Sequence, residues 1–142
     1  MSDQQRIMVV TGATNGIGLV TARALAHTGA TVVLVGRSAE RLAMAVADIR
    51  ANVPDAHLDT ICADLSSQAE VLHVADTIKA RYSRIDVLLN NAGAFFTQRQ
   101  LSVDGIEMTW ALNHMAPFIL TTALLDLFRS SAPARIITVS SM

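Results

Sequence analysis

Short apolar runs alternate with longer stretches of helical periodicity along the whole chain. The runs lie at residues 7–10, 31–35, 58–62, 87–89 and 136–139. Apolar runs of this length are typical of buried strands. Strands that are separated by helices imply right-handed crossover connections, and they predict a parallel sheet with helices on both faces.

Apolar residues at intervals of three and four predict the helices between these runs. The first helix is expected to end near Gly29, and the second is expected to end before Pro54. The third is expected to follow a cap at Ser66 and Ser67, because a serine side chain can accept a hydrogen bond from the first helical turn. A long fourth helix is predicted over residues 105–129.

The composition agrees with one α/β domain over residues 1–142. Hydrophobic residues make up 51% of the chain and charged residues 16%, and a sheet that is apolar on both faces explains this excess. The net charge is −1 and the basic residues are scattered, which argues against nucleic acid and acidic membranes as partners. No apolar run approaches the ~18 residues of a membrane span.

Neither the start of the chain nor its cysteine and histidine residues suggest export or a metal site. Residues 1–6 are polar and lead into the first strand, so no signal peptide is expected and the cytoplasm is the expected compartment. Cys62 is the only cysteine, which excludes an internal disulfide, and its place within a strand predicts a core position. His27, His57 and His73 have no metal-ligand spacing with Cys62 or with one another, so no metal is predicted.

The turn after the first strand carries the clearest chemical signal. Residues 11–18 read Thr-Gly-Ala-Thr-Asn-Gly-Ile-Gly and open a helix. Glycines here can adopt a positive φ and let a ligand approach the backbone, while the free amides and the dipole at the helix start favour a phosphate. We therefore predict a nucleotide site, against the alternative of a tight turn without a ligand. The predicted cofactor-binding residues of this turn are Gly12, Thr14, Asn15, Gly16, Ile17 and Gly18.

Arg37 follows the second strand, at a place that distinguishes NAD from NADP in dinucleotide-binding folds. An acidic residue there holds the ribose 2′-hydroxyl group, whereas a basic residue favours a 2′-phosphate. The chain has no carboxylate between Arg37 and Glu40, and a guanidinium group can bind a phosphate through two donors. NADP is therefore predicted in preference to NAD. The alternative is a solvated surface arginine.

Two further polar motifs follow the third and fourth strands. Asp64 could accept a hydrogen bond from an adenine amino group, or it could cap the next helix, and the sequence leaves both alternatives open. Residues 90–93 read Asn-Asn-Ala-Gly. The two amides can crosslink the turn, and the small residues leave space for a flat ligand.

These motifs resemble those of the short-chain dehydrogenase/reductase family. The features that occur in the family's order and spacing are residues 11–18, Asp64, Leu65, residues 90–93, Asn113 and residues 136–141. Residues 101–107 and 113–118 are similar to the branch that contains retinol dehydrogenases and protochlorophyllide reductases. The resemblance implies a Rossmann-type doubly wound parallel sheet, truncated after the fifth strand. It also implies an NADP-dependent oxidoreductase that transfers a hydride between nicotinamide and a small carbonyl or alcohol substrate.

The resemblance implies cofactor-binding roles for individual residues. Residues 11–18 would hold the pyrophosphate, and Asp64 and Leu65 would hold the adenine. The residues implied on the side of the adenosine ribose are Asn91, Ala92 and Gly93.

Two residues would take part in the reaction itself. Ser141 would hydrogen-bond the reacting carbonyl or alcohol, with Ser140 as the alternative, and Asn113 would bind a proton-relay water. A local argument supports Asn113, because Pro117 has no N–H to donate to the Asn113 carbonyl. The helix should therefore kink, and the free carbonyl should find a water. The alternative is a kinked core helix in which Asn113 only packs.

The family's general acid, a tyrosine in a Tyr-x-x-x-Lys motif, is expected about a dozen residues beyond Ser141, but the sequence ends at Met142. Tyr82 and Lys79, the only tyrosine and the only lysine, do not form this motif. We therefore expect this chain to be the amino-terminal part of a larger enzyme and to be inactive alone. Its fifth strand would be an open apolar edge that invites pairing with other chains, including further copies of this one.

Two other functions remain as alternatives. One is a non-catalytic nucleotide-binding or interaction module, because the given sequence contains the nucleotide motifs without the Tyr-x-x-x-Lys motif. The other is a different member of the wider fold group, such as a sugar-nucleotide epimerase or an NADP-sensing regulator. The Asn-Asn-Ala-Gly motif and Asn113 argue against this last group.

Overall fold

The computed structural model describes residues 5–141 and contains one sheet of five strands in the order β3-β2-β1-β4-β5. The strands are β1 (Ile7–Thr11), β2 (Thr31–Gly36), β3 (His57–Cys62), β4 (Val87–Asn90) and β5 (Arg135–Thr138). Every neighbouring pair is parallel, which confirms the predicted doubly wound sheet. Most of the polar start, on which the expectation of no signal peptide rests, lies outside the described residues.

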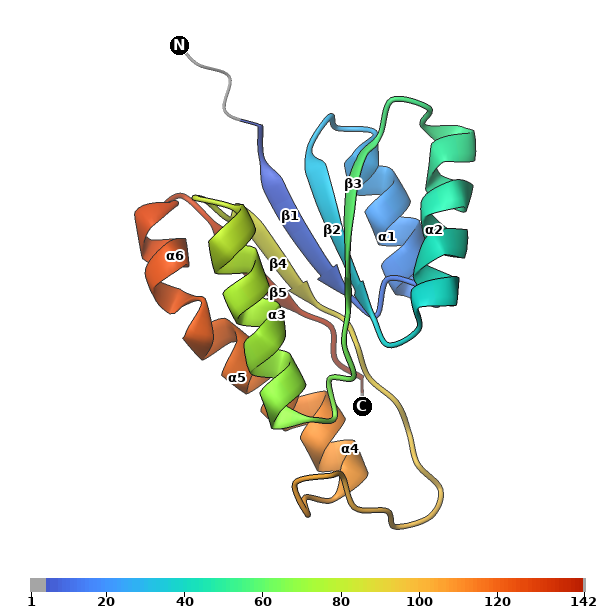
Figure 1. Ribbon diagram of the computed structural model, residues 1–142, viewed down its shortest axis with the longest axis vertical. Coiled ribbons are helices and arrows are strands. Elements are labelled where there is room, and N and C mark those ends of the chain that lie inside the picture. Colours follow the sequence, from blue (N-terminus) through green and yellow to red (C-terminus); the bar gives the residue numbers. More distant parts are fainter. Residues whose placement is uncertain (1–4, 142) are drawn as a thin grey trace.

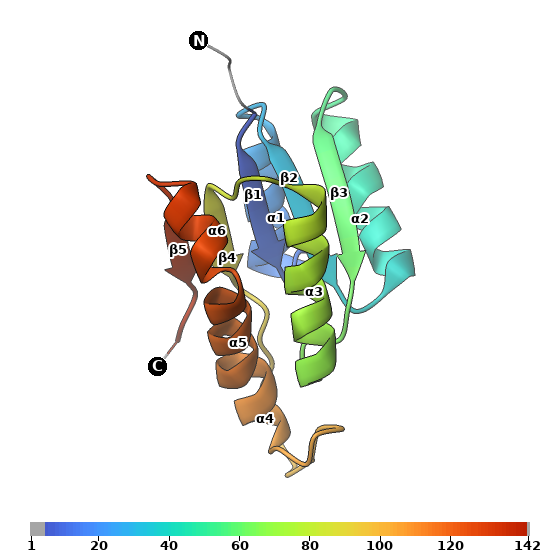
Figure 2. The same ribbon diagram turned by 60° about the vertical axis from the view of Figure 1, so that its left-hand side comes forward.

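Helices cover both faces of this sheet, as Figures 1 and 2 show. One face carries α1 (Gly16–Ala26) and α2 (Ala39–Asn52), and the other carries α3 (Gln68–Arg81), α5 (Ala116–Ala123) and α6 (Leu125–Ser130). Serine side chains begin two of them: Ser38 accepts a hydrogen bond from the first turn of α2, and Ser67 does so for α3. Among the described helices, none is long and apolar enough to cross a membrane.

Alternate residues of the central strands point into two separate cores. Val9 and Val33 pack in the core that contains α3, α5 and α6. Val10 and Leu34 pack in the core that contains α1 and α2. All four side chains are fully buried. Strands that are buried on both faces need continuous apolar runs rather than alternation, and this is the pattern that the sequence shows.

The single long helix predicted over residues 105–129 is wrong at its start. Gly105 has a φ of 74° and belongs to a turn, so the helix cannot continue back through it. The first helical segment is α4 (Met108–Trp110). It begins there because the Glu107 carboxylate accepts hydrogen bonds from the N–H groups of Thr109 and Trp110.

The same predicted helix is interrupted twice further along. The π-helical turn η1 (Ala111–Met115) links α4 to α5, and in it the N–H of Ala116 donates to the carbonyl of Ala111, five residues earlier. This distortion lies where Pro117 predicts one, because proline has no N–H to continue the regular pattern. A second interruption at Leu124, with φ −97° and ψ 1°, separates α5 from α6. No sequence feature predicts the second interruption.

Both edges of the sheet are more exposed than its centre. Cys62, which was expected in the core, is exposed at the end of the edge strand β3. The four residues of β5 are also exposed, although the strand pairs along its length with β4. The apolar edge that the sequence predicts at the fifth strand is therefore present within the described residues.

Candidate functional site

The turn between β1 and α1 is shaped by two close backbone approaches. Gly12 has a φ of 63°, and a Cβ on it would lie 2.9 Å from the Cα of Ala92. A Cβ on Gly18 would lie 2.1 Å from the carbonyl oxygen of Gly12. Only glycine fits at either position. The start of α1 can therefore lie directly against the turn, as the sequence predicts.

Thr11 and Asn91 join this turn to the segment that follows β4. The Thr11 hydroxyl accepts hydrogen bonds from the N–H groups of Asn91 (3.0 Å) and Ala92 (2.9 Å). The Asn91 side-chain amide donates to the carbonyls of Thr11 (3.1 Å) and Gly12 (3.2 Å). The crosslink that the sequence expects from the two asparagines is thus made by Asn91 together with the Thr11 hydroxyl, whose role the sequence analysis missed.

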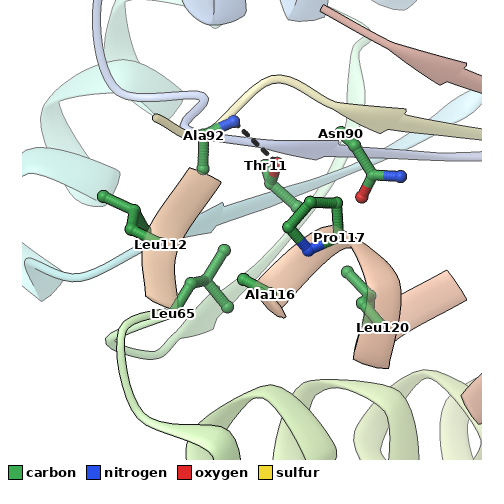
Figure 3. Close-up of a pocket in the computed structure, with 8 residues that line it drawn as sticks. All are labelled: Thr11, Leu65, Asn90, Ala92, Leu112, Ala116, Pro117 and Leu120. Carbon is green, nitrogen blue, oxygen red and sulfur yellow. Dashed lines mark hydrogen bonds between the residues drawn. The ribbon is translucent and has the colours of Figure 1, made fainter. Parts of the chain in front are cut away.

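Figure 3 shows Thr11 bonded to Ala92 beside a small cavity between the sheet and α5. Asn90 and Pro117 also line this cavity, which measures about 10 Å³. A cavity of that size holds about one water molecule and no larger ligand. The Asn90 amide donates to the hydroxyl of Thr121 at 3.1 Å, which ties β4 to α5.

Asn113 is held in η1 by the segment that follows residues 90–93. Its side-chain oxygen accepts a hydrogen bond from the N–H of Ala94 (2.9 Å), and its side-chain nitrogen donates to the carbonyl of Ala94 (2.8 Å). A Cβ on Gly93 would lie 3.2 Å from that same oxygen. The structure therefore brings together two motifs that lie 20 residues apart in the sequence. The binding of a water by the Asn113 carbonyl stays a prediction.

A cleft of about 360 Å³ opens where the carboxyl ends of β1, β2, β3 and β4 meet. Strand order reverses direction between β1 and β4, and ligands of open α/β sheets bind at such a switch point. The cleft is large enough for a substantial part of a nucleotide. The sequence-predicted residues that line it are Gly12, Thr14, Asn15, Arg37, Asp64, Leu65, Ala92 and Gly93.

Six predicted site residues lie outside this lining: Gly16, Ile17, Gly18, Asn91, Asn113 and Ser141. Gly18 and Asn91 shape the turn from behind, through the contacts described above. Asn113 holds Ala94, which does line the cleft. Ser141 is exposed beyond β5. Of these six residues, Gly18, Asn91 and Asn113 therefore position segments that line the cleft.

Several residues that line the cleft are not among the predicted site residues, and those with large or polar side chains include Arg41, Phe96, Gln100, Met108 and Leu112. Arg41 lies in the first turn of α2, one turn after Arg37, and its spacing from Arg37 could have identified it. Phe96 and Gln100 belong to the loop between β4 and α4. A loop that folds back over a sheet edge leaves no periodic signal, so these two could not have been found.

Asp64 does not cap α3, because Ser67 occupies that position. One oxygen of the Asp64 carboxylate accepts hydrogen bonds from the N–H (3.0 Å) and the hydroxyl (2.7 Å) of Ser66. The N–H of Asp64 is in turn bonded to the Glu70 carboxylate. These contacts fix the turn after β3, and Asp64 also lines the cleft. Its contact with a ligand stays a prediction.

Glu107, which precedes α4, has a lowered pKa. Hydrogen bonds from the N–H groups of Trp110 and Thr109 hold the pKa of Glu107 below its usual value. This carboxylate therefore stays charged where it begins α4, the helical segment directly before η1.

Among residues 5–141, no cluster of histidine, cysteine and carboxylate side chains has the arrangement of a metal site.

The chain's own tyrosine and lysine lie outside the residues that line the cleft. The hydroxyl of Tyr82 donates to the Asp59 carboxylate at 2.6 Å. Burial raises the pKa of Tyr82, and the hydrogen bond to Asp59 raises it further. Lys79 forms an ion pair with Asp76 at 3.2 Å. Tyr82 is thus bonded to a residue of β3, and Lys79 is paired with a residue of α3.

Comparison with known proteins finds a matching family and several similar proteins. The family described as short chain dehydrogenase matches residues 6–142. Retinol dehydrogenase 13 of Homo sapiens is 38% identical over 137 residues, which cover 96% of this chain and 41% of that protein. The WW domain-containing oxidoreductase of Homo sapiens is 39% identical, and the match covers 96% of this chain and 33% of that protein.

Solved structures show the same similarity. A metagenomic short-chain oxidoreductase in complex with NADP superposes with a TM-score of 0.84 at 31% identity, over 96% of this chain and 62% of that chain. The chain therefore spans less than two thirds of these relatives. The similarity to retinol dehydrogenases that the sequence indicates is confirmed. Because the family match extends over residues 6–142, nearly the whole chain, this protein belongs to the short chain dehydrogenase family.

Proposed function

We propose that this chain binds NADP in the cleft at the ends of β1 to β4, as the cofactor-binding part of a short-chain oxidoreductase. The observation that carries the proposal is that the glycine turn and Arg37 line one cleft. A turn of this kind binds the pyrophosphate, and an arginine after the second strand binds a 2′-phosphate. The metagenomic relative and the RhlG structure of Pseudomonas aeruginosa both contain NADP, which supports the choice of cofactor.

The residues of the cleft fit such a cofactor. The N-cap of α1, Asn15, makes no side-chain hydrogen bond to the first helical turn, so its side chain does not occupy the amides that would meet a phosphate. A Cβ on Gly16 would have no atom within 4 Å, which leaves the outer side of the turn open. Asp64 and Leu65 line the cleft after the end of β3, where the proposal places the adenine.

The proposed reaction is the transfer of a hydride between the nicotinamide of NADP and a small carbonyl or alcohol compound. The nicotinamide supplies or accepts the hydride when it is bound. In the proposal Asn113 holds a water for proton transfer, and Ser141, or alternatively Ser140, hydrogen-bonds the substrate oxygen. The first role belongs to the main-chain carbonyl of Asn113. Its side-chain amide supports this role indirectly, because both ends are bonded to Ala94 and hold the residue in place.

Binding of NADPH and NADH to the 142-residue chain tests the cofactor assignment. We expect Arg37→Asp to weaken NADPH binding at least about tenfold, because it removes a phosphate donor and adds a like charge, and to change NADH binding much less. The measurement is titration of the intrinsic fluorescence of each dinucleotide. Arg50→Asp is the matched control, since Arg50 lies in the last turn of α2, the helix that follows Arg37, and outside the cleft. An equal effect of Arg37→Asp on both dinucleotides would contradict the 2′-phosphate role.

A second candidate function is a nucleotide-binding module without catalysis. The contacts of Tyr82 and Lys79 favour this function for the 142-residue chain. These residues are of the types that the family uses for proton transfer, and neither side chain lines the cleft. The two candidates differ in turnover rather than in binding. Oxidation of NADPH in the presence of a panel of small carbonyl compounds would show the oxidoreductase, whereas saturable NADPH binding without any oxidation would show the module.

A further inference from the structure

The loop between β4 and α4 ends in a small hairpin over residues 100–108, which we call the cleft hairpin. Leu101 and Glu107 pair in antiparallel fashion across it. The hydroxyl of Ser102, a buried residue, accepts hydrogen bonds from two N–H groups of its turn, both at 3.3 Å. The cleft hairpin is therefore held in shape by its own hydrogen bonds.

Asp104, in the turn of the cleft hairpin, reaches the start of α3. Its carboxylate accepts a hydrogen bond from the N–H of Gln68 at 2.9 Å, although the two residues lie 36 positions apart. Figure 1 shows the loop before α4 running past this end of α3. Gln68 is the first residue of α3, so its N–H has no partner within the helix. A carboxylate is favourable at this positive end of the helix dipole, and Asp104 therefore holds the hairpin against α3.

This bond joins two segments that both line the cleft. Gln100 and Met108 belong to the cleft hairpin, and residues 64–66 belong to the turn that leads into α3. Asp104 itself is not among the lining residues. Within residues 5–141, the bond from Gln68 to Asp104 is the only hydrogen bond between the hairpin and this turn. It therefore fixes one surface of the cleft relative to another.

The position of the Asp64 carboxylate depends on the start of α3. The carboxylate accepts two hydrogen bonds from Ser66. The N–H of Ser67 donates to the Asp64 carbonyl at 3.1 Å, and Ser67 directly precedes Gln68. A movement of Gln68 away from the hairpin would therefore carry the Asp64 carboxylate with it.

We propose that Asp104 is a positioning residue for the base of the bound nucleotide. By fixing the start of α3 to the cleft hairpin, it places the Asp64 carboxylate where the amino group of adenine can donate to it. The inference rests on the proposed function, because it concerns the base end of the same cofactor. Asp104 acts through the N–H of Gln68 and does not touch the nucleotide, so its effect depends on the base.

The test compares NADPH with its hypoxanthine analogue, in which an oxo group replaces the amino group of adenine. Each is titrated with the 142-residue chain through its own fluorescence. A carboxylate accepts a hydrogen bond from an amino group and repels an oxo oxygen, so the wild-type chain should bind NADPH at least about fivefold more tightly. Asp104→Ala is expected to weaken NADPH binding about fivefold and analogue binding less than about twofold, so that the preference for adenine is lost.

Two variants of aspartates control for charge. Asp104→Ala removes a negative charge, which by itself would favour an anionic ligand, so a weaker affinity is opposite to the simple charge effect. Asp104→Asn keeps an oxygen acceptor and should restore most of the NADPH affinity. Asp126→Ala removes the same charge from α6, outside the cleft, and should change neither affinity.

Gln68→Pro removes the same bond from its donor. Proline is tolerated at the first position of a helix, and Ser67 before it is extended, with φ −96° and ψ 123°, as a residue before proline requires. This variant should show the same selective loss of NADPH binding. The double variant D104A/Q68P should bind NADPH no more weakly than either single variant, because both remove one bond. Additive losses would contradict the proposed bond.

Equal weakening of both dinucleotides by Asp104→Ala would overturn the inference, because a general loss of shape would then explain the effect. Unchanged affinities would overturn it as well. If the wild-type chain bound both dinucleotides equally well, the inference would fail while nucleotide binding stood. If it bound neither, the proposed function itself would fail.

Discussion

At the scale of single residues, the hydroxyl of Thr11 joins the glycine turn to the segment after β4, a role that the sequence motif does not reveal. Its side chain is 2% exposed, and its oxygen accepts two backbone hydrogen bonds from the segment after β4. It also donates to the carbonyl of Leu89 at 3.4 Å. A buried hydroxyl with this many partners is costly to remove, because the partners lose their bonds without gaining water.

We therefore predict that Thr11→Val lowers the free energy of unfolding by about 1–3 kcal/mol, although valine has nearly the same shape. Urea denaturation measures this change. Thr11→Ser is the control, because it keeps the hydroxyl and should retain most of the stability. A loss in Thr11→Ser as large as that in Thr11→Val would assign the effect to the methyl group instead.

Several site residues could be predicted from the sequence because their chemistry is local. Gly12 and Gly18 are required by close backbone approaches within and around one turn, and such turns have a recognisable spacing. Arg37 could be placed because the end of β2 was visible in the apolar pattern. The roles of Phe96 and Gln100 depend on how a loop folds back over the cleft, and no local pattern specifies that path.

At the scale of elements, the strands could be predicted better than the last helix. The apolar runs identify all five strands to within a residue or two. For the central strands the reason is that a strand covered on both faces must be apolar throughout. Helical periodicity over residues 105–129, by contrast, persists through the turn at Gly105 and the interruption at Leu124. Periodicity reports which face is buried and is insensitive to a local change in the hydrogen-bond pattern.

The contact between β3 and the end of α3 has a distinct pH dependence. Tyr82 donates to Asp59, and Arg81 forms an ion pair with the same carboxylate at 2.9 Å. Burial alone would raise the pKa of Asp59, but the hydrogen bonds from Tyr82, the N–H of Thr60 and Arg81 lower it. Burial and the bond to Asp59 raise the pKa of Tyr82. The pair is therefore held as a neutral phenol and a charged carboxylate.

We predict that Tyr82→Phe lowers the free energy of unfolding by about 1 kcal/mol at pH 7. The raised pKa of Tyr82 means that its stabilisation is complete below the pKa of a tyrosine in the unfolded chain, about 10, and is lost as the pH rises through the higher folded value. Denaturation at pH 7 and pH 11 measures both quantities. The difference between wild type and Tyr82→Phe should shrink at the higher pH, and an unchanged difference would contradict the assignment.

At the scale of the whole molecule, the two edges of the sheet differ. On β3 the large apolar side chains Leu58 and Ile61 are partly or fully buried, whereas Ile136 (42% exposed) and Ile137 (45% exposed) on β5 are exposed. Within the described residues β5 pairs only with β4. An apolar edge strand with unpaired backbone groups is a template for pairing with another chain.

We therefore predict that the 142-residue chain associates with itself and that Ile137→Lys raises the concentration at which association begins by about tenfold. Sedimentation velocity over a range of concentrations measures it. Val20→Lys is the matched control, because Val20 is 60% exposed on α1, away from the sheet edge. A monomeric wild-type chain, or an equal effect of both substitutions, would contradict a role for the strand edge.

The hydrogen bonds between Thr11, Asn91 and the two turns have a consequence for ligand binding. They hold the glycine turn and the segment after β4 in one arrangement in the free protein. The loss of conformational entropy in these loops is therefore part of folding and does not recur when a nucleotide arrives. Affinity at this end of the cleft can then come almost entirely from the contacts themselves. The same contacts join the central strands β1 and β4, so a change that loosened the turn would weaken the fold and the binding together.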